Sequence, residues 1–119
     1  MEHVRRLSDE QNGEADRYLA LLRSSPYSPP TDSPVDPEVL SLLVDQGRVV
    51  KVSESVVFDA DAYQEMVVQI KGRIEDRGEI TVADVRDMFG ASRKYSLALL
   101  DHMDKQRITR RVGDSRILR

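Results

Sequence analysis

The strongest constraint on the fold lies in residues 80–119, where helix start and stop signals follow one another closely. Thr81 and Asp84 stand at the spacing of a capping box ahead of an apolar-periodic run. Gly90 can end that helix in a left-handed conformation, and Ser92 can cap a second helix. Two short helices joined by about three residues that include a glycine are typical of a helix-turn-helix.

A hairpin is predicted directly after the second helix, which runs to Lys105. Residues 107–112 and 115–118 flank the pair Gly113-Asp114. A glycine at the first position of a two-residue loop suits a type II′ turn. Helix, turn, helix and hairpin in this order are typical of a winged helix, a module that usually binds nucleic acid.

The charge of the chain is distributed unevenly. The whole chain carries −3, which taken alone argues against a nucleic-acid partner. Residues 91–119, however, hold eight Lys or Arg against three Asp, a net charge of +5, so residues 1–90 carry −8. A polyanion needs only a local positive field, although an ordinary solvated surface would have the same composition.

Two breaches of local stability rules favour a binding site over a solvated surface. Arg93 and Lys94 open the second helix, where the positive end of the helix dipole disfavours cations. With the turn at Gly113-Asp114, Arg111 faces Arg116 across the hairpin as a like-charge pair. A phosphate backbone would relieve both costs. We therefore expect one continuous positive surface made of Arg93, Lys94, Arg110, Arg111 and Arg116.

The second helix has two distinct faces on a helical wheel. The face predicted to be buried comprises Ala91, Tyr95, Ala98, Leu99, Met103 and, at its margin, Leu100. The outward face comprises Arg93, Lys94, Leu97, Asp101, Asp104 and Lys105. Because Asp101 and Asp104 make that face acidic, we expect a nucleic acid to contact the start of the helix and not its length.

The upstream part contains a degenerate copy of the same pattern. The predicted elements are a helix over 8–23, a proline-rich segment over 24–34, a helix over 37–46, a hairpin over 48–58 and a long helix from Asp59 or Asp61 to Gly78. Helix and hairpin in 37–58 echo those in 93–118. We predict a mostly α, α+β architecture of two tandem winged helices, a degenerate one over 1–58 and a complete one over 59–119. A single composite helical domain is the alternative.

Several classes of function find no support in the composition. The chain has no cysteine, so it has no disulfide and no thiolate metal site, and no apolar stretch reaches the length of a membrane span. We expect a soluble, cytoplasmic protein. His3 and His102 lie too far apart to suggest a ligand pair, and no arrangement typical of nucleophilic catalysis is visible. We expect no enzyme activity, no catalytic residue and no metal site.

Three segments carry a resemblance to a known family. Residues 80–87 (ITVADVRD), 91–95 (ASRKY) and 109–116 (TRRVGDSR) resemble the carboxyl-terminal end of the bacterial selenocysteine-specific translation elongation factors, the SelB family. The resemblance is specific over 80–119, because the segments occur together at the right separation, and it is weaker upstream. The chain also ends just after the second strand of the predicted wing, where the resemblance places the carboxyl terminus of proteins in the family.

The resemblance implies a function in RNA recognition. In that family, winged helices follow a GTPase part, and the last one grips the selenocysteine-insertion hairpin of the mRNA. The GTPase part delivers selenocysteyl-tRNA to the ribosome. This chain has no Gly-x-x-x-x-Gly-Lys-Ser/Thr stretch, so GTP and Mg²⁺ would belong to a missing amino-terminal part and this fragment would hold no cofactor.

The expected function is thus RNA-hairpin recognition by a monomeric fragment. The candidate RNA-binding residues are Ser92, Arg93, Lys94, Arg107, Arg110, Arg111 and Arg116. Residues 1–58 would act as a spacer between the RNA-binding unit and the GTPase part. A DNA-binding regulator and a protein-interaction winged helix are the alternatives.

Overall fold

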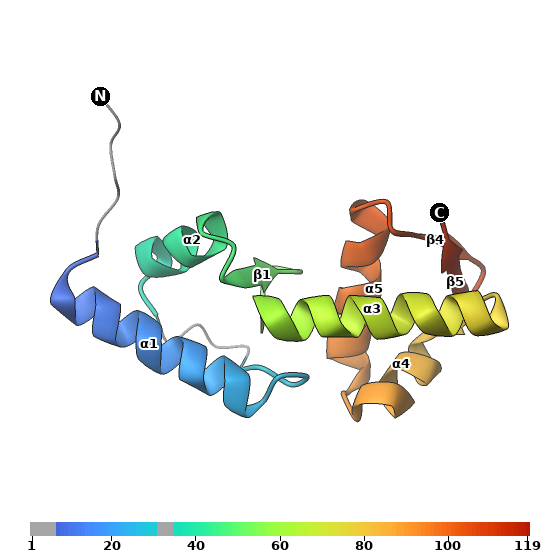
Figure 1. The fold of residues 1–119 in the computed structure, drawn as a ribbon, viewed down its shortest axis with the longest axis horizontal. Helices are drawn as coiled ribbons and strands as arrows, with labels where there is room; N and C mark the ends of the chain where they lie inside the picture. The colour runs from blue at the N-terminus through green and yellow to red at the C-terminus, as the bar shows by residue number, and fades with distance from the viewer. Residues whose placement is uncertain (1–6, 31–34) are drawn as a thin grey trace.

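The computed structural model describes residues 7–30 and 35–119, an elongated body of 48 × 33 × 20 Å (Figure 1). It is mostly helical, with two small antiparallel sheets. The elements are α1 (Asp9–Ser24), α2 (Pro37–Asp45), β1 (Val49–Lys51), β2 (Val57–Asp59), α3 (Ala60–Arg77), β3 (Ile80–Thr81), α4 (Val82–Phe89), α5 (Arg93–Lys105), β4 (Thr109–Val112) and β5 (Ser115–Leu118). His3 and residues 31–34 of the proline-rich segment lie outside the described residues.

The helix-turn-helix forms where its signals stand. In the capping box, the Asp84 amide donates to Thr81 Oγ1 at 3.2 Å and the Thr81 amide donates to Asp84 Oδ2 at 3.0 Å. Gly90 ends α4 in the left-handed region with φ 64°, which a side chain would strain. α5 follows at Arg93, so both helices and the glycine between them are confirmed.

The wing has the predicted register. Val112 pairs with Ser115, which leaves Gly113-Asp114 as the turn, and Gly113 takes φ 60° as the first position of a type II′ turn requires. β5 lies between β4 and a third strand, β3, in which Ile80 pairs with Arg116. β3 was not predicted. The carboxyl-terminal unit therefore has the winged-helix fold.

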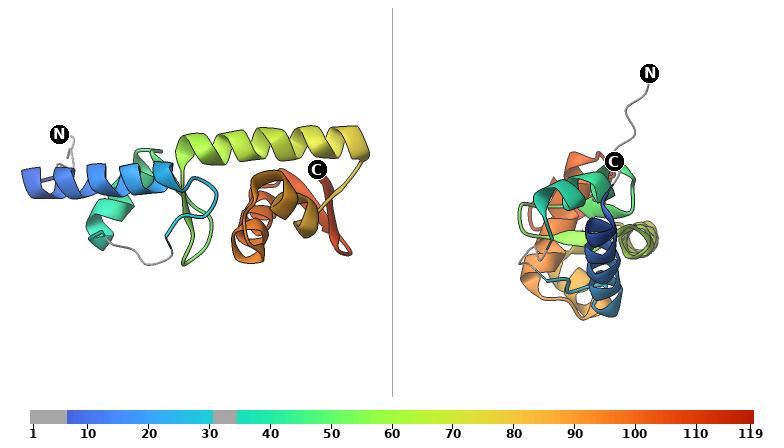
Figure 2. Two further views of the ribbon diagram at one scale, coloured as in Figure 1. Left: turned by 90° about the horizontal axis from the view of Figure 1, so that it is seen from below. Right: turned by 90° about the vertical axis from the view of Figure 1, so that its left-hand side faces the viewer.

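The amino-terminal unit consists of α1, α2 and the hairpin β1–β2. α1 and α3 follow one another along the long axis, as the left view of Figure 2 shows. The core of this unit comprises Ala15, Tyr18, Leu19, Leu22, Val35, Val39, Leu43, Val49 and Val57. The described part of the segment between α1 and α2 contains no helix, as its prolines predict. The division into tandem winged helices at residue 58 stays a prediction.

One strand serves two cores. Val57 is buried in the amino-terminal core, whereas Phe58 is buried with α3, α4 and α5. Side chains of successive strand residues point to opposite faces, so β2 packs on both units at once. Val52 and Val56 join the same carboxyl-terminal core, and α3 begins directly after β2 with Asp59 as its cap. A cut between residues 58 and 59 would therefore remove buried side chains from the winged helix.

A second contact joins the two units through residues 25–30. The Tyr27 ring packs on Phe89 at the end of α4, with 5.1 Å between ring centroids. The Tyr95 hydroxyl, in the first turn of α5, donates to the Pro29 carbonyl at 2.8 Å. The amino-terminal unit thus contacts the helix-turn-helix directly at both ends of the turn between α4 and α5.

The shared core generates a prediction with a matched control. Val56→Ala removes a side chain that is 1% exposed, and we expect the free energy of unfolding to fall by about 2 kcal/mol. Val68→Ala makes the same chemical change on α3 at a site that is 58% exposed, so stability should stay within about 0.5 kcal/mol. Urea unfolding of both variants measures the difference. Equal losses would show that Val56 does not belong to the winged-helix core.

Candidate nucleic-acid interface

A hollow of about 200 Å³ lies where the starts of α4 and α5 meet the wing tip. Its lining consists of Thr81, Val82, Ala83, Arg93, Leu97, Arg111, Asp114 and Arg116. Arg93 from α5 and Arg111 from β4 therefore face the same space, as the sequence predicts. The two guanidinium groups come from elements that no local signal links, and the wing register brings them together.

The start of α5 is suited to an anion. Arg93 and Lys94 occupy its first turn, both are exposed, and no acidic residue accompanies them. Ser92 is the N-cap residue, as predicted, yet its hydroxyl makes no capping hydrogen bond. Amides in the first turn of a helix and the helix dipole both attract negative charge. Ser92, Arg93 and Lys94 thus present donors and positive charge at one point.

Arg116 lines the hollow but is almost fully buried, so the prediction that it contributes to an exposed positive surface is wrong. Its side chain is 2% exposed, with Nη2 donating to Asp101 Oδ1 at 2.8 Å and Nε donating to Asp104 Oδ2 at 3.1 Å. Asp101 and Asp104 stand three residues apart on α5 and so share a face. The Thr109 hydroxyl also donates to Asp104, at 2.6 Å. We call Arg116, Asp101 and Asp104 the wing clamp.

The wing clamp corrects two further expectations. Asp101 and Asp104 do not form a bare acidic face, because both carboxylates bind the Arg116 guanidinium. Arg111 does pair with Arg116 across the hairpin, but the Arg116 charge is matched by the two carboxylates, so the like-charge pair costs little. The Arg111 Nε donates instead to the Gly113 carbonyl at 3.0 Å. Of the two breaches seen in the sequence, only the cations at the start of α5 remain.

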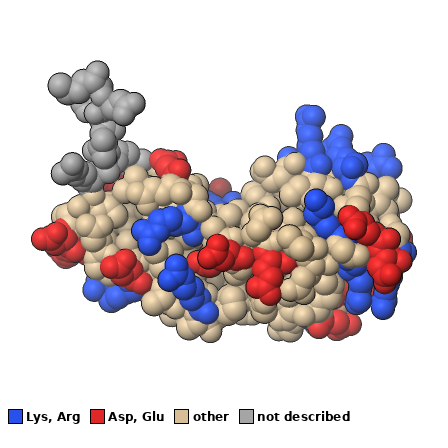
Figure 3. All heavy atoms as spheres, viewed as in Figure 1, with Lys and Arg blue, Asp and Glu red and all other residues tan. Residues whose placement is uncertain are grey.

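Two of the candidate RNA-binding arginines, Arg107 and Arg110, do not line the hollow. Arg107 follows the carboxyl end of α5, which a helix of this length places about 20 Å from Arg93. Arg110 is the neighbour of Arg111 in β4, so its side chain points to the other face of the hairpin. Figure 3 shows Lys and Arg side chains gathered at the upper right, over the end where α5 passes into the wing. Arg107 and Arg110 therefore lie outside the hollow.

Sequence reasoning missed the apolar lining of the hollow. Val82 and Ala83 come from the first turn of α4, and Leu97 comes from α5, one helical turn after Arg93. The helical wheel places Leu97 on the outward face of the helix, where it predicts no contact for this side chain. An isolated apolar residue on a polar helix face was the available signal.

Other chemistry in the described residues is structural. His102 is half-buried and packs edge-on against Tyr63 at 5.6 Å between ring centroids, and burial lowers its pKa.

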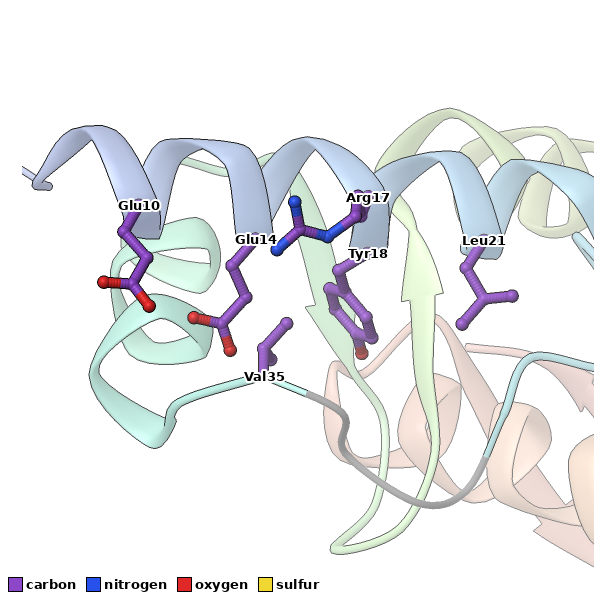
Figure 4. Close-up of a pocket in the computed structure, with 6 residues that line it drawn as sticks. All are labelled: Glu10, Glu14, Arg17, Tyr18, Leu21 and Val35. Atoms are coloured by element: carbon purple, nitrogen blue, oxygen red, sulfur yellow. The ribbon is translucent and has the colours of Figure 1, made fainter.

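A larger hollow of about 380 Å³ lies beside α1, lined by Glu10, Glu14, Arg17, Tyr18, Leu21 and Val35 (Figure 4). Glu14 in this hollow accepts a hydrogen bond from the Asp36 amide at 2.7 Å. The described ranges contain no group of three or more His, Cys, Asp or Glu able to hold a metal, and none of their helices could cross a membrane.

The wing clamp leads to a stability prediction. Arg116→Ala leaves two carboxylates without their partner, and we expect a loss of about 2–4 kcal/mol, reduced from a fully buried pair because Asp101 is half-exposed. Arg111→Ala removes the same side chain from an exposed position in the opposite strand and should cost at most about 0.5 kcal/mol. Denaturant unfolding of the two variants distinguishes a structural arginine from a surface one. A stable Arg116→Ala variant would contradict the clamp.

The comparisons with known proteins agree with this geometry. Residues 73–118 match the winged-helix family of elongation factor SelB. Over 82 residues the chain is 32% identical to the selenocysteine-specific elongation factor of Desulfomicrobium baculatum, a match that covers 69% of this chain and 13% of that protein.

Two solved structures share the fold. The mRNA-binding domain of elongation factor SelB from E. coli, in complex with SECIS RNA, matches with a TM-score of 0.73 and 22% identity over 95% of this chain and 99% of that one. A bacterial selenocysteine-specific elongation factor, EF-Sec, matches with a TM-score of 0.76 and 15% identity over 98% of this chain and 20% of that one. Residues 73–118 of this chain are therefore similar to the winged-helix family of elongation factor SelB, and the chain shares its fold with the mRNA-binding domain of that factor.

Proposed function

We propose that this chain is the RNA-binding part of a selenocysteine-specific elongation factor and that its carboxyl-terminal winged helix binds an mRNA hairpin of the selenocysteine-insertion type. The placement of Arg93 and Arg111 around one hollow at the starts of α4 and α5 carries this proposal. One of the solved structures with the same fold is the mRNA-binding domain of elongation factor SelB from E. coli in complex with SECIS RNA. The role proposed for the chain is binding, not catalysis.

The hollow suits a folded RNA loop better than a long duplex. The base edges of an A-form stem lie in a deep, narrow groove, so proteins read RNA sequence at loops and bulges and hold stems by their phosphates. Arg93 and Arg111 can bind phosphate in a bidentate manner, and Ser92 and Lys94 add donors beside them. Val82, Ala83 and Leu97 supply apolar contacts for an unstacked base.

The rest of the proposed activity depends on parts outside this chain, which spans 13% of its curated relative. GTP, Mg²⁺, selenocysteyl-tRNA and the ribosome would be bound by a linked GTPase part, in the cytoplasm. We propose a monomer for this fragment. Residues 1–58 would hold the RNA-bound winged helix in a fixed orientation, since Tyr27, Pro29 and Phe58 contact it.

The two alternative functions predict different surfaces. A DNA-binding regulator reads the major groove along the outward face of its recognition helix. On α5 that face carries Asp101 and Asp104. Their carboxylates donate no hydrogen bonds and already bind Arg116, so this face has few groups free to bind bases. A protein-interaction winged helix would use the arginines on an acidic partner, and RNA would compete with that partner.

Binding measurements on two arginine variants test the proposal. We expect Arg93→Ala to cost about 1–3 kcal/mol of hairpin binding and to reduce the discrimination between loops, as loss of a base contact does. Arg111→Ala should weaken all RNAs alike and lower the slope of log K against log salt by about 1, as loss of a phosphate contact does. Arg48→Ala removes an exposed arginine from the amino-terminal unit and should change neither quantity.

The ligand panel consists of RNA hairpins, the same stems with scrambled loops, stems without loops and DNA duplexes. Equal losses on cognate and scrambled loops for both variants would leave a nonspecific polyanion binder. Tighter binding of a DNA duplex than of any hairpin would favour the regulator.

A further inference from the structure

α2 and α5 end in the same turn. At the end of α2, the Arg48 amide donates to the Leu43 carbonyl and the Gly47 amide to the Val44 carbonyl, both at 3.0 Å. At the end of α5, the Ile108 amide donates to the Met103 carbonyl at 3.0 Å and the Arg107 amide to the Asp104 carbonyl at 3.1 Å. This pair of bonds defines a Schellman motif, whose residue after the cap takes a left-handed conformation. Gly47 and Arg107 occupy that equivalent position.

Arg107 is an unfavourable residue for this position. Gly47 has φ 71° and Arg107 has φ 61°, and within residues 7–30 and 35–119 Arg107 is the one residue other than glycine with a positive φ. Glycine adopts this conformation at no steric cost, whereas a side chain strains it. A strained residue kept where a glycine would fit better indicates a use for its side chain.

Other exposed cations lie close to Arg107 in the sequence or, as Arg119 does, join the start of the wing through a backbone hydrogen bond. The exposed residues Lys105, Arg107, Arg110 and Arg119 form what we call the distal basic patch. The Arg119 amide donates to the Ile108 carbonyl at 3.2 Å, which sets Arg119 beside the start of the wing. None of the four has an ion-pair partner among the described residues, and Asp104 in the same turn is already bound by Arg116 and Thr109.

The helix dipole explains only part of this patch. A cation in the last turn of a helix is stabilised by the negative end of the dipole, which accounts for Lys105. It does not account for an arginine at the one left-handed position, because a glycine there and a cation elsewhere in the turn would give the same benefit without strain.

We propose that the distal basic patch binds the phosphate backbone of an RNA segment different from the one held at the hollow. Lys105 and Arg107 lie about 20 Å from Arg93, at the other end of α5, and the side chain of Arg110 points to the face of the hairpin away from the hollow. One winged helix would therefore hold two stretches of backbone. Three of its four cations are arginines, whose planar fork matches phosphate oxygens. The segment is either the far end of the stem of the same hairpin or a separate structured RNA. This inference rests on the proposed function only in taking RNA as the ligand.

The test uses the full chain and two kinds of RNA probe. The first probe is a hairpin in two versions, one with a short stem and one with an extended stem. The second is a labelled RNA duplex, titrated into protein that is saturated with the short-stem hairpin. The patch variant is Lys105→Gln/Arg107→Gln/Arg119→Gln, and the control is Arg17→Gln/Arg48→Gln/Lys71→Gln, which removes the same charges from exposed positions elsewhere.

We expect the patch variant to bind the short-stem hairpin within about twofold of the original chain and to lose about 10- to 100-fold in affinity for the extended-stem hairpin or for the duplex. Loss on the extended stem assigns the segment to the same hairpin, and loss on the duplex assigns it to a separate RNA. Unchanged binding of both ligands, or an equal loss in the control, would overturn the inference. An equal loss on the short-stem hairpin would also overturn it, since the patch would then belong to the hollow.

Arg107→Gly separates binding from stability. Glycine relieves the left-handed strain, so the melting temperature should rise by about 2–5 °C while binding of the extended stem or duplex weakens. A variant that is more stable and binds equally well would show that the arginine has no RNA contact. If the original chain bound the duplex through the patch but no hairpin at the hollow, the proposed function would fail and the patch would stand.

Discussion

The geometry of the candidate interface depends on one buried guanidinium. Arg116 is 1% exposed, and a charge at such a site is stable only when it is paired and hydrogen-bonded. Asp101 and Asp104 on α5 supply that pairing, so the middle strand of the sheet is fixed to the recognition helix. Arg111 stands opposite Arg116 in the hairpin, and its position over the start of α5 follows from the same attachment. A buried arginine in the wall of the hollow thereby sets the distance between the two exposed arginines, Arg93 and Arg111, that face it.

The other side of the hollow is held by independent contacts. The capping box at Thr81 and the left-handed Gly90 fix where α4 starts and ends. Tyr27 and Pro29 reach from the amino-terminal unit to Phe89 and Tyr95, which flank the turn between α4 and α5. Since ordering side chains on binding lowers affinity, a site held from several directions before the ligand arrives binds more tightly than a flexible one. The amino-terminal unit contributes to the site in this way without lining it.

Structure that depends on neighbouring residues could be predicted from the sequence, whereas contacts between side chains of distant elements could not. The capping box at Thr81, the Gly90 turn, the Gly113-Asp114 turn and the winged-helix order depend on neighbouring residues and are confirmed. The burial of Arg116 depends on two carboxylates in a different element, α5. The sequence of a strand does not show whether an arginine in it is buried or exposed, so this burial could not be predicted. The left-handed conformation of Arg107 could not be predicted, because the residue that usually indicates such a turn at the end of a helix is a glycine. The two-sided packing of β2 was hidden because its three residues are all buried and show no alternation.

The two hairpins in the described residues show how few residues distinguish the first hairpin from the candidate binding wing. In the first hairpin, Lys51 pairs with Glu54 at 3.9 Å, so its positive charge is partly compensated, and Gly47 lets the preceding helix end without strain. In the second, Arg110 and Arg111 have no ion-pair partner within the described residues, and Arg107 replaces the glycine. The turn that ends the helix before each hairpin, α2 or α5, is the same in both and has the same backbone hydrogen bonds. A polyanion would therefore be attracted to the second hairpin by the charge of its side chains and not by a different backbone. The left-handed conformation of Arg107 is the backbone strain that accompanies these charges.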